Sequence, residues 1–211
     1  MIKAVIFDLD GVLVSTDEMH FKAWSRLAEE IGITSFTKED NLRQRGVSRM
    51  ASLEIVLEKS DKKFSTEEKE KLAERKNTYY CEMLKSLTPN DVLDGALEFL
   101  KYLKANGIKT AVGSASKNAP IILERTGLRE YLDAVSCGLD VTKSKPDPEV
   151  FLVAAKKLGI APEDCLVVED AHAGIMAAKN GNMYALAVGA AYGDDMADFS
   201  MKNLAKLEAI I

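Results

Sequence analysis

The chain has 211 residues, of which 47% are hydrophobic and 29% are charged, a balance typical of a folded domain with a well-packed core. Its net charge of −5 gives no electrostatic attraction to nucleic acids or anionic membranes, so we expect neither as a partner. No segment has the pattern of a secretory leader or a membrane span. The three cysteines lie far apart, which favours free thiols and a cytoplasmic location.

The chain begins with an apolar segment that predicts a buried strand over residues 2–7. Two carboxylates, Asp8 and Asp10, follow it directly. Gly11 then permits a sharp turn, because a residue without a Cβ adopts positive φ at little cost. A lone pair of this kind is most simply explained as a solvated acidic turn. The apolar run, the glycine and Thr16 together favour an enzyme that carries a phosphoryl group on aspartate.

Helical periodicity fills the next stretch, with no strand pattern between residues 17 and 87. We predict a helix over 17–31 ended by Gly32, a helix from Thr37, and another after the 45–49 loop to about residue 59. Ser65 and Glu68 form a capping box that starts a long helix to about residue 86. The sequence therefore predicts a helical domain of residues 16–87 inserted into a core of residues 1–15 and 88–211.

From Pro89 onward, strand and helix patterns alternate, which predicts a parallel sheet covered on both faces. This is the pattern of an α/β, Rossmann-like, doubly wound fold. Asp147 is expected to cap one of the helices, with Pro148 at its first position. The strands are expected over 108–114, 134–136, 165–168 and 184–188. The helices are expected over 94–106, 118–126, 148–158, 171–180 and 202–211.

Polar residues follow four of the predicted strands, and the carboxyl ends of parallel strands meet at one edge of a sheet. These residues are Asp8 with Asp10, Ser114-Ala115-Ser116, Lys145, and Glu169 with Asp170. The set suits phosphoryl transfer to a carboxylate, with Asp8 as the nucleophile. Ser114 would hold the phosphoryl oxygens and Lys145 would neutralise charge that develops during transfer. The crowded carboxylates predict a hard cation such as Mg²⁺.

Each of these residues taken alone has a simpler explanation. A serine at a strand end usually forms a turn, and a lysine before proline usually lies in a solvated loop. Glu169 and Asp170 would also serve as an acidic start to a helix. Their joint occurrence in this order is what favours a common site.

These motifs resemble the haloacid dehalogenase-like phosphotransferases over the whole chain. The residues that carry the resemblance are DLDGVL, the strand-end Ser114, Lys145 in KSKPDP and Glu169-Asp170 in VVEDAHAG. The resemblance implies a core of this family's fold with a small all-helical cap domain. It also implies Mg²⁺ bound by Asp8, Glu169, Asp170 and the backbone carbonyl of Asp10.

Within the family, the chain resembles the mutases that act on hexose phosphates. The residues that support this narrower resemblance are Thr16, His20, Trp24, Gly46, Val47, Ser48, Arg49, Ser52, Lys76, and Ser114 to Asn118. It implies interconversion of β-glucose 1-phosphate and glucose 6-phosphate through a phospho-aspartate enzyme and β-glucose 1,6-bisphosphate. We expect a monomer that binds a small hexose phosphate.

The same resemblance implies a role for each group of residues. Asp10 would act as the general acid and base. The distal phosphate of the sugar would be held by Arg49 with Ser116, Lys117 and Asn118, close to Ala115. The sugar would be lined by His20, Trp24, Ser52 and Lys76, beside the loop of Gly46, Val47 and Ser48. Thr16 would link closure of the cap to the placement of Asp10.

Two other functions fit parts of the sequence. A sugar-phosphate phosphatase would use the same Asp8 chemistry with water as the second acceptor, but would not need Arg49 and Lys76. A non-catalytic sugar-phosphate sensor would have no use for both Asp8 and Asp10. Without the resemblance, Trp24 would be assigned to the helical core. We expect His172 to be a surface or capping residue, and assign no role to residues 189–199.

Overall fold

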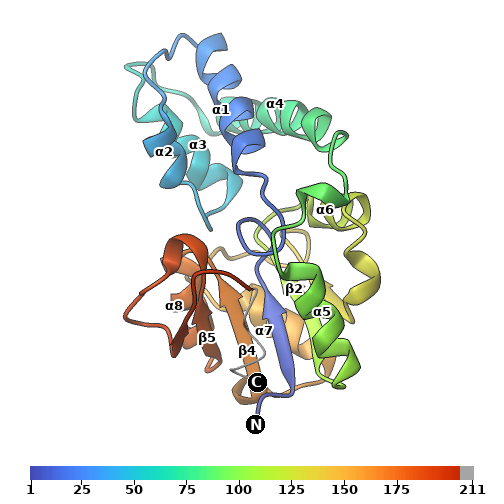
Figure 1. The fold of residues 1–211 in the computed structure, drawn as a ribbon. Coiled ribbons are helices and arrows are strands. Elements are labelled where there is room, and N and C mark those ends of the chain that lie inside the picture. The colour runs from blue at the N-terminus through green and yellow to red at the C-terminus, as the bar shows by residue number, and fades with distance from the viewer. Residues whose placement is uncertain (205–211) are drawn as a thin grey trace. The chain divides into compact units, whose positions relative to one another are not determined.

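The computed structural model describes residues 1–204, and their Cα positions divide into two compact units. We call residues 1–15 together with those from 87 onward the core unit, and residues 16–86 the helical unit (Figure 1). Each unit is described by itself. Within residues 1–204, no helix is long and apolar enough to span a membrane.

The core unit is built on a parallel sheet, which confirms the α/β fold class. Within the described residues the strand order is β3-β2-β1-β4-β5-β6. The chain builds outward from β1 to β2 and β3, and then returns to the other side of β1, so the sheet is doubly wound. The strands are β1 (Ala4–Phe7), β2 (Lys109–Gly113), β3 (Ala134–Ser136), β4 (Cys165–Glu169), β5 (Tyr184–Ala187) and β6 (Phe199–Ser200).

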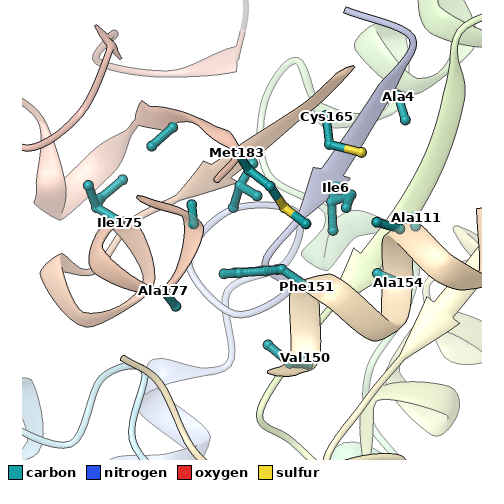
Figure 2. Packing of buried hydrophobic residues seen from close by; sticks show 14 of the residues in the cluster. Ala4, Ile6, Ala111, Val150, Phe151, Ala154, Cys165, Ile175, Ala177 and Met183 are labelled. Atoms are coloured by element: carbon teal, nitrogen blue, oxygen red, sulfur yellow. The ribbon is translucent and has the colours of Figure 1, made fainter. Parts of the chain in front are cut away.

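Helices cover both faces of this sheet because successive strand residues point to opposite sides. Ile6 belongs to a buried cluster with Phe151 of α7 (Glu149–Leu158) and Ile175 of α8 (His172–Asn180), part of which Figure 2 shows. Phe7 points the other way, and its ring lies 5.9 Å from that of Phe99 on α5 (Ala96–Ala105). Helix α6 (Ala119–Arg125) follows β2. The central strand is therefore fully buried, as its unbroken apolar sequence predicts.

The helical unit has its own apolar core. Its helices are α1 (Asp17–Glu30), α2 (Lys38–Leu42), α3 (Arg49–Leu57) and α4 (Thr66–Leu84). Trp24 and Leu27 of α1 pack with Leu53 and Val56 of α3 and with Leu72 of α4. The predicted capping box is present, since the Ser65 hydroxyl accepts from Glu68 N–H at 3.3 Å and the Glu68 carboxylate accepts from Ser65 N–H at 2.7 Å.

Some predicted element ends are wrong by one or two residues. Helix α7 is capped by Pro148 and not by Asp147, although the Asp147 carboxylate does accept a hydrogen bond from Glu149 N–H at 3.0 Å. Helix α5 begins at Ala96, because Gly95 takes a left-handed conformation with φ of +82°. The closing helix predicted over 202–211 falls almost wholly outside the described residues.

Short elements were missed by the sequence patterns. Strand β6 was not predicted, and neither were the 3-10 helices Pro89–Asp91, Arg129–Tyr131, Pro162–Asp164 and Gly189–Ala191. The three cysteines are free thiols, as predicted, with Cys137 and Cys165 buried and Cys81 partly exposed.

Candidate active site

The predicted strand-end carboxylates of the core unit lie at the carboxyl edge of the sheet, beside β1 and β4, where the strand order reverses. Phe7 of β1 stands in register with Val168 of β4, and Asp8 N–H donates to Val168 O at 2.9 Å. Asp8 and Glu169 therefore leave adjacent strands at the same edge, followed by Asp170. All three are buried, with Glu169 only 1% exposed. This edge is where ligands bind in open α/β sheets.

Lys145 joins two of these carboxylates from a loop between β3 and α7. Its Nζ lies 2.5 Å from Asp8 Oδ1 and also donates to Glu169 Oε1. The ring of Phe151 lies 4.7 Å from the same nitrogen. Because its side chain is fully buried, Lys145 differs from the solvated loop lysine that its sequence context alone suggests.

The charged groups in this cluster shift one another's pKa values. Burial and the charge of Asp8 together raise the pKa of Glu169 to about 7, although Lys145 opposes the rise. Burial acts to lower the pKa of Lys145, but Asp8 and Glu169 outweigh it and raise that pKa above its ordinary value. Lys145 is therefore a cation at neutral pH, and one cation faces more than one buried carboxylate.

Gly11 brings the turn after β1 against Asp170. The glycine has φ of +86°, and a Cβ placed on it would lie only 2.2 Å from Asp170 Oδ2. Gly11 N–H also donates to Val14 O at 2.8 Å, and Val14 N–H donates to Leu9 O at 3.1 Å, which closes the turn that contains Asp10. The turn can thus approach the carboxylate so closely only because residue 11 has no side chain.

The Ser114–Asn118 loop follows β2, the strand on the other side of β1. Ser114 is 2% exposed, and its hydroxyl accepts from Ser116 N–H at 3.1 Å. The Ser116 hydroxyl in turn accepts from Asn118 N–H at 3.2 Å. Ala115 is partly exposed and Lys117 is exposed. The serines do form turns here, and Ser114 also lies at the strand edge that carries Asp8.

Two of the predicted sugar-binding residues of the helical unit, His20 and Trp24, lie against a third, Lys76. Lys76 is 3% exposed, and its Nζ lies 2.8 Å from His20 Nδ1 and 4.7 Å from the Trp24 ring. The His20 ring stacks on Tyr80 at 4.0 Å. Thr16 is buried at the start of α1 and accepts a hydrogen bond from the Tyr80 hydroxyl at 3.1 Å.

This arrangement keeps His20 neutral. Burial lowers the pKa of His20 well below its ordinary value, and the cations Lys76 and Arg49 lower it further. A lysine ammonium can only donate, so the Nδ1 of His20 accepts and its proton lies on Nε2. Trp24 belongs to the core of this unit and contacts Lys76 as well.

The Gly46–Arg49 loop leads directly into α3. Gly46 has φ of +71°, and Val47 and Ser48 are partly exposed. Ser48 caps α3 by accepting from Ala51 N–H at 3.2 Å. Arg49 is the first residue of the helix, and its Nη1 lies 3.1 Å from Glu74 Oε2.

Ser52, within α3, contacts the segment that precedes this loop. The residue is buried, and its carbonyl accepts a hydrogen bond from Gln44 Nε2 at 2.9 Å. The structure therefore places the predicted site residues in two groups, one in each unit.

Comparison with known proteins supports a common ancestry. The family model of haloacid dehalogenase-like hydrolases matches residues 2–182. The chain belongs to this family. β-Phosphoglucomutase from Bacillus subtilis is 44% identical over 89% of this chain and 83% of that protein. A phosphorylated carbohydrates phosphatase from Thermotoga maritima is 34% identical over 86% of this chain and 82% of that protein.

A solved structure agrees with this assignment. The crystal structure of β-phosphoglucomutase from Clostridium difficile matches with a TM-score of 0.92 and 40% identity. The match covers 98% of this chain and 93% of that one. The fold predicted for a haloacid dehalogenase-like protein is thereby confirmed.

Sequence reasoning missed partners of several of these residues. Phe151 contacts Lys145 and Tyr80 contacts Thr16, but in the sequence nothing distinguishes these two aromatic residues from others in the predicted helices. Asp194 was assigned no role, yet its Oδ2 lies 2.6 Å from Nδ1 of the exposed His172. No spacing in the sequence links residues 172 and 194, so only the fold could reveal this pair.

The carboxylates of this haloacid dehalogenase-like core fit a hard cation by their chemistry. Asp8, Glu169 and Asp170 are all oxygen donors, and they are buried with Lys145 as a counter-ion. Because Gly11 has no Cβ, the Asp170 carboxylate can lie against the turn that follows Asp8 and Asp10. Among residues 1–204, no three His, Cys, Asp or Glu side chains are grouped as they would be around a bound metal ion.

Proposed function

We propose that this chain is a β-phosphoglucomutase that converts β-D-glucose 1-phosphate to D-glucose 6-phosphate. The observation that carries the proposal is the pair of polar clusters. The core unit holds Asp8 against Lys145, and the helical unit holds Lys76 against His20. The 44% identity to the Bacillus subtilis β-phosphoglucomutase supports the same substrate. In this proposal the helical unit is the cap domain of the enzyme.

The first half-reaction transfers the C1 phosphoryl group of β-glucose 1,6-bisphosphate to the enzyme and releases glucose 6-phosphate. A carboxylate oxygen of Asp8 attacks phosphorus, and the bond from phosphorus to the sugar oxygen breaks. Asp10 gives its proton to that leaving oxygen. The product on the enzyme is an acyl phosphate at Asp8. Lys145 stabilises the negative charge on the transferring oxygens, and Ser114 donates a hydrogen bond to them.

The second half-reaction passes the phosphoryl group from Asp8 to the 6-hydroxyl of β-glucose 1-phosphate, which forms β-glucose 1,6-bisphosphate again. Asp10, now a carboxylate, takes the proton of the attacking hydroxyl. The new bond from oxygen to phosphorus forms as the acyl phosphate bond to Asp8 breaks. Proton and phosphoryl group both balance over the cycle, and Asp10 ends as it began.

Residues of the helical unit recognise the sugar and its second phosphate. Arg49 presents a planar guanidinium that can donate two parallel hydrogen bonds to phosphate. Neutral His20 and cationic Lys76 offer donors to sugar hydroxyls, while Ser52 and the Gly46–Ser48 loop shape the same region. In the core unit, Ser116, Lys117 and Asn118 complete the set of phosphate donors, beside Ala115.

Mg²⁺ is the proposed cofactor. Asp8, Glu169, Asp170 and the backbone carbonyl of Asp10 would hold it. When bound, the ion supplies positive charge that offsets the crowded carboxylates and the incoming phosphate. We further propose that the enzyme works as a cytoplasmic monomer.

A phosphatase that uses the same aspartate is the second candidate, and the 34% identity to the Thermotoga maritima phosphatase is the observation in its favour. The two functions differ only in the acceptor of the second step, which is a sugar hydroxyl or water. The deciding experiment supplies β-glucose 1-phosphate, Mg²⁺ and a trace of β-glucose 1,6-bisphosphate. Glucose 6-phosphate as the main product supports the mutase, and inorganic phosphate as the main product rejects it.

A further inference from the structure

Arg49 is already paired with an anion that belongs to the chain itself. Its Nη1 lies 3.1 Å from Oε2 of Glu74, which lies on α4 of the same helical unit. The Arg49 side chain is 25% exposed, whereas that of Glu74 is 69% exposed. The guanidinium is thus held against the protein, and the carboxylate reaches it from a position open to solvent.

The surroundings of this pair attract negative charge. Arg49 is the first residue of α3, and the first turn of that helix contains no acidic residue. The amino end of a helix carries a partial positive charge, so a cation placed there adds to it. The charge of Arg49 also reaches His20 and helps to lower the pKa of that residue. Glu74 is the anion that meets this positive region.

We propose that Glu74 is a specificity-determining residue, a resident carboxylate that the distal phosphate of the substrate must displace from Arg49. A dianionic phosphate can replace a carboxylate on a guanidinium, because it brings more charge and a matching pair of oxygens. A hydroxyl at the same position of the sugar cannot. Glu74 therefore lowers the affinity for all anions at Arg49 and keeps weaker ligands off it.

The exchange is easy because of where each partner lies. A carboxylate as exposed as that of Glu74 returns to water with little penalty, and exposed pairs of this kind contribute weakly. Arg49 does not need to move. This inference rests on the proposed role of Arg49 in holding the second phosphate.

The test compares Glu74→Gln with Glu67→Gln. Glu67 lies on the same helix, is 76% exposed and pairs with Lys71 at 2.6 Å, so its substitution makes the same change in net charge. Glu74→Gln should lower the KM for β-glucose 1,6-bisphosphate by about two- to five-fold at low salt, with kcat unchanged. The KM for p-nitrophenyl phosphate should not change, because this substrate has no second phosphate. Glu67→Gln should leave both values as they are.

Salt and a conservative substitution separate this role from a structural one. High salt screens exposed charges, so the difference between Glu74→Gln and the unmodified protein should shrink as NaCl is added. Glu74→Asp, which keeps the carboxylate, should restore most of the original KM. An unchanged or higher KM for the bisphosphate in Glu74→Gln overturns the inference, and so does an equal fall in Glu67→Gln.

The experiment also distinguishes this inference from the proposed function. If the protein releases only inorganic phosphate, the mutase assignment fails, but the KM values for hydrolysis of the bisphosphate still report on Glu74. If Arg49→Ala leaves the KM for the bisphosphate unchanged, Arg49 does not bind the second phosphate and the inference falls with that role.

Discussion

The ammonium of Lys145 lies 2.5 Å from Asp8 Oδ1, although 137 residues separate the two in sequence. Lys145 follows β3 and Asp8 follows β1, and β2 lies between these strands in the sheet. The contact therefore depends on the whole sheet being assembled in this order. It also gives the proposed nucleophile a fixed counter-ion in a buried place.

Lys145→Met should damage both stability and activity. Without the ammonium, the carboxylates of Asp8 and Glu169 are left buried and uncompensated, which costs about 3 kcal/mol of unfolding free energy. Turnover should fall at least about a hundredfold, because a donor to the transferring oxygens is lost. Urea unfolding without added divalent cation and a steady-state assay measure the two effects.

Lys143→Met is the matched control for this prediction. Lys143 lies two residues earlier in the same loop, and its side chain is 68% exposed beside Asp147. Both stability and turnover should stay close to those of the unmodified protein. A similar loss in the two variants would show that the loop, and not the buried ammonium, is responsible.

Asp8→Asn should abolish mutase flux and phosphate release together. An amide is a very poor nucleophile, so no acyl phosphate can form. The substitution also removes a negative charge that helps to raise the pKa of Glu169, so the variant should stay folded. Mass spectrometry after incubation with substrate should find phosphorylated protein only for the unmodified chain. Turnover near the original level in Asp8→Asn would rule out this nucleophile.

Gly11→Ala should reduce activity more than the cost of an unfavourable φ alone explains. The new methyl group would lie 2.2 Å from Asp170 Oδ2 and would push that carboxylate away from the turn. Gly32→Ala is the control, because Gly32 has the same φ of +86° and nothing within 4 Å of its Cβ position. Both variants should lose about 1 kcal/mol of stability from backbone strain. Only Gly11→Ala should lose turnover and require more Mg²⁺ for half-maximal rate.

His20 should make stability fall as the medium becomes acidic. Its pKa in the folded chain is well below the ordinary 6.5. Below pH 6.5 the unfolded chain binds a proton at His20 that the folded chain does not. The unfolding free energy therefore decreases as pH falls through 6.5 and is unaffected well above pH 6.5. One pH unit below 6.5, the loss of unfolding free energy has an upper limit of about 1.4 kcal/mol. The expected loss is below this limit, because the His20 ring is partly exposed.

The comparison for this prediction is His20→Gln. A glutamine oxygen can still accept from Lys76, but the side chain does not titrate. Urea unfolding of both proteins between pH 5.5 and pH 7.5 gives the difference, in which the other titrating groups largely cancel. Parallel curves for the two proteins over this range would contradict the assigned state of His20.

Much of the fold follows from local sequence signals. The unbroken apolar run before Asp8 predicts a strand buried on both faces, and the structure has β1 there. Ser65 and Glu68 predict the start of α4, and both hydrogen bonds of the capping box are present. The alternation of strands and helices predicts a parallel sheet covered on both faces, and the structure has one.

Other features could not be predicted because they depend on distant contacts. Strand β6 has only two residues and pairs with β5 through the backbone, so its side chains carry no pattern. The pairing of Arg49 with Glu74 joins two helices, and a charged helix face contains many candidates for such a contact. The sequence motifs predict which residues bear chemistry, whereas the partners that tune those residues are chosen by packing.

The two places where the backbone leaves and re-enters the core unit are joined by backbone hydrogen bonds. Val14 and Val92 form an antiparallel bridge, and Leu93 N–H donates to Leu13 O at 2.9 Å. The residues between these points thus form one continuous insertion whose two ends lie side by side in the core unit. Evolution can exchange such an insertion for another while the strands that bear the reacting aspartate keep their register. The catalytic residues of the core unit can then act on new substrates without themselves changing.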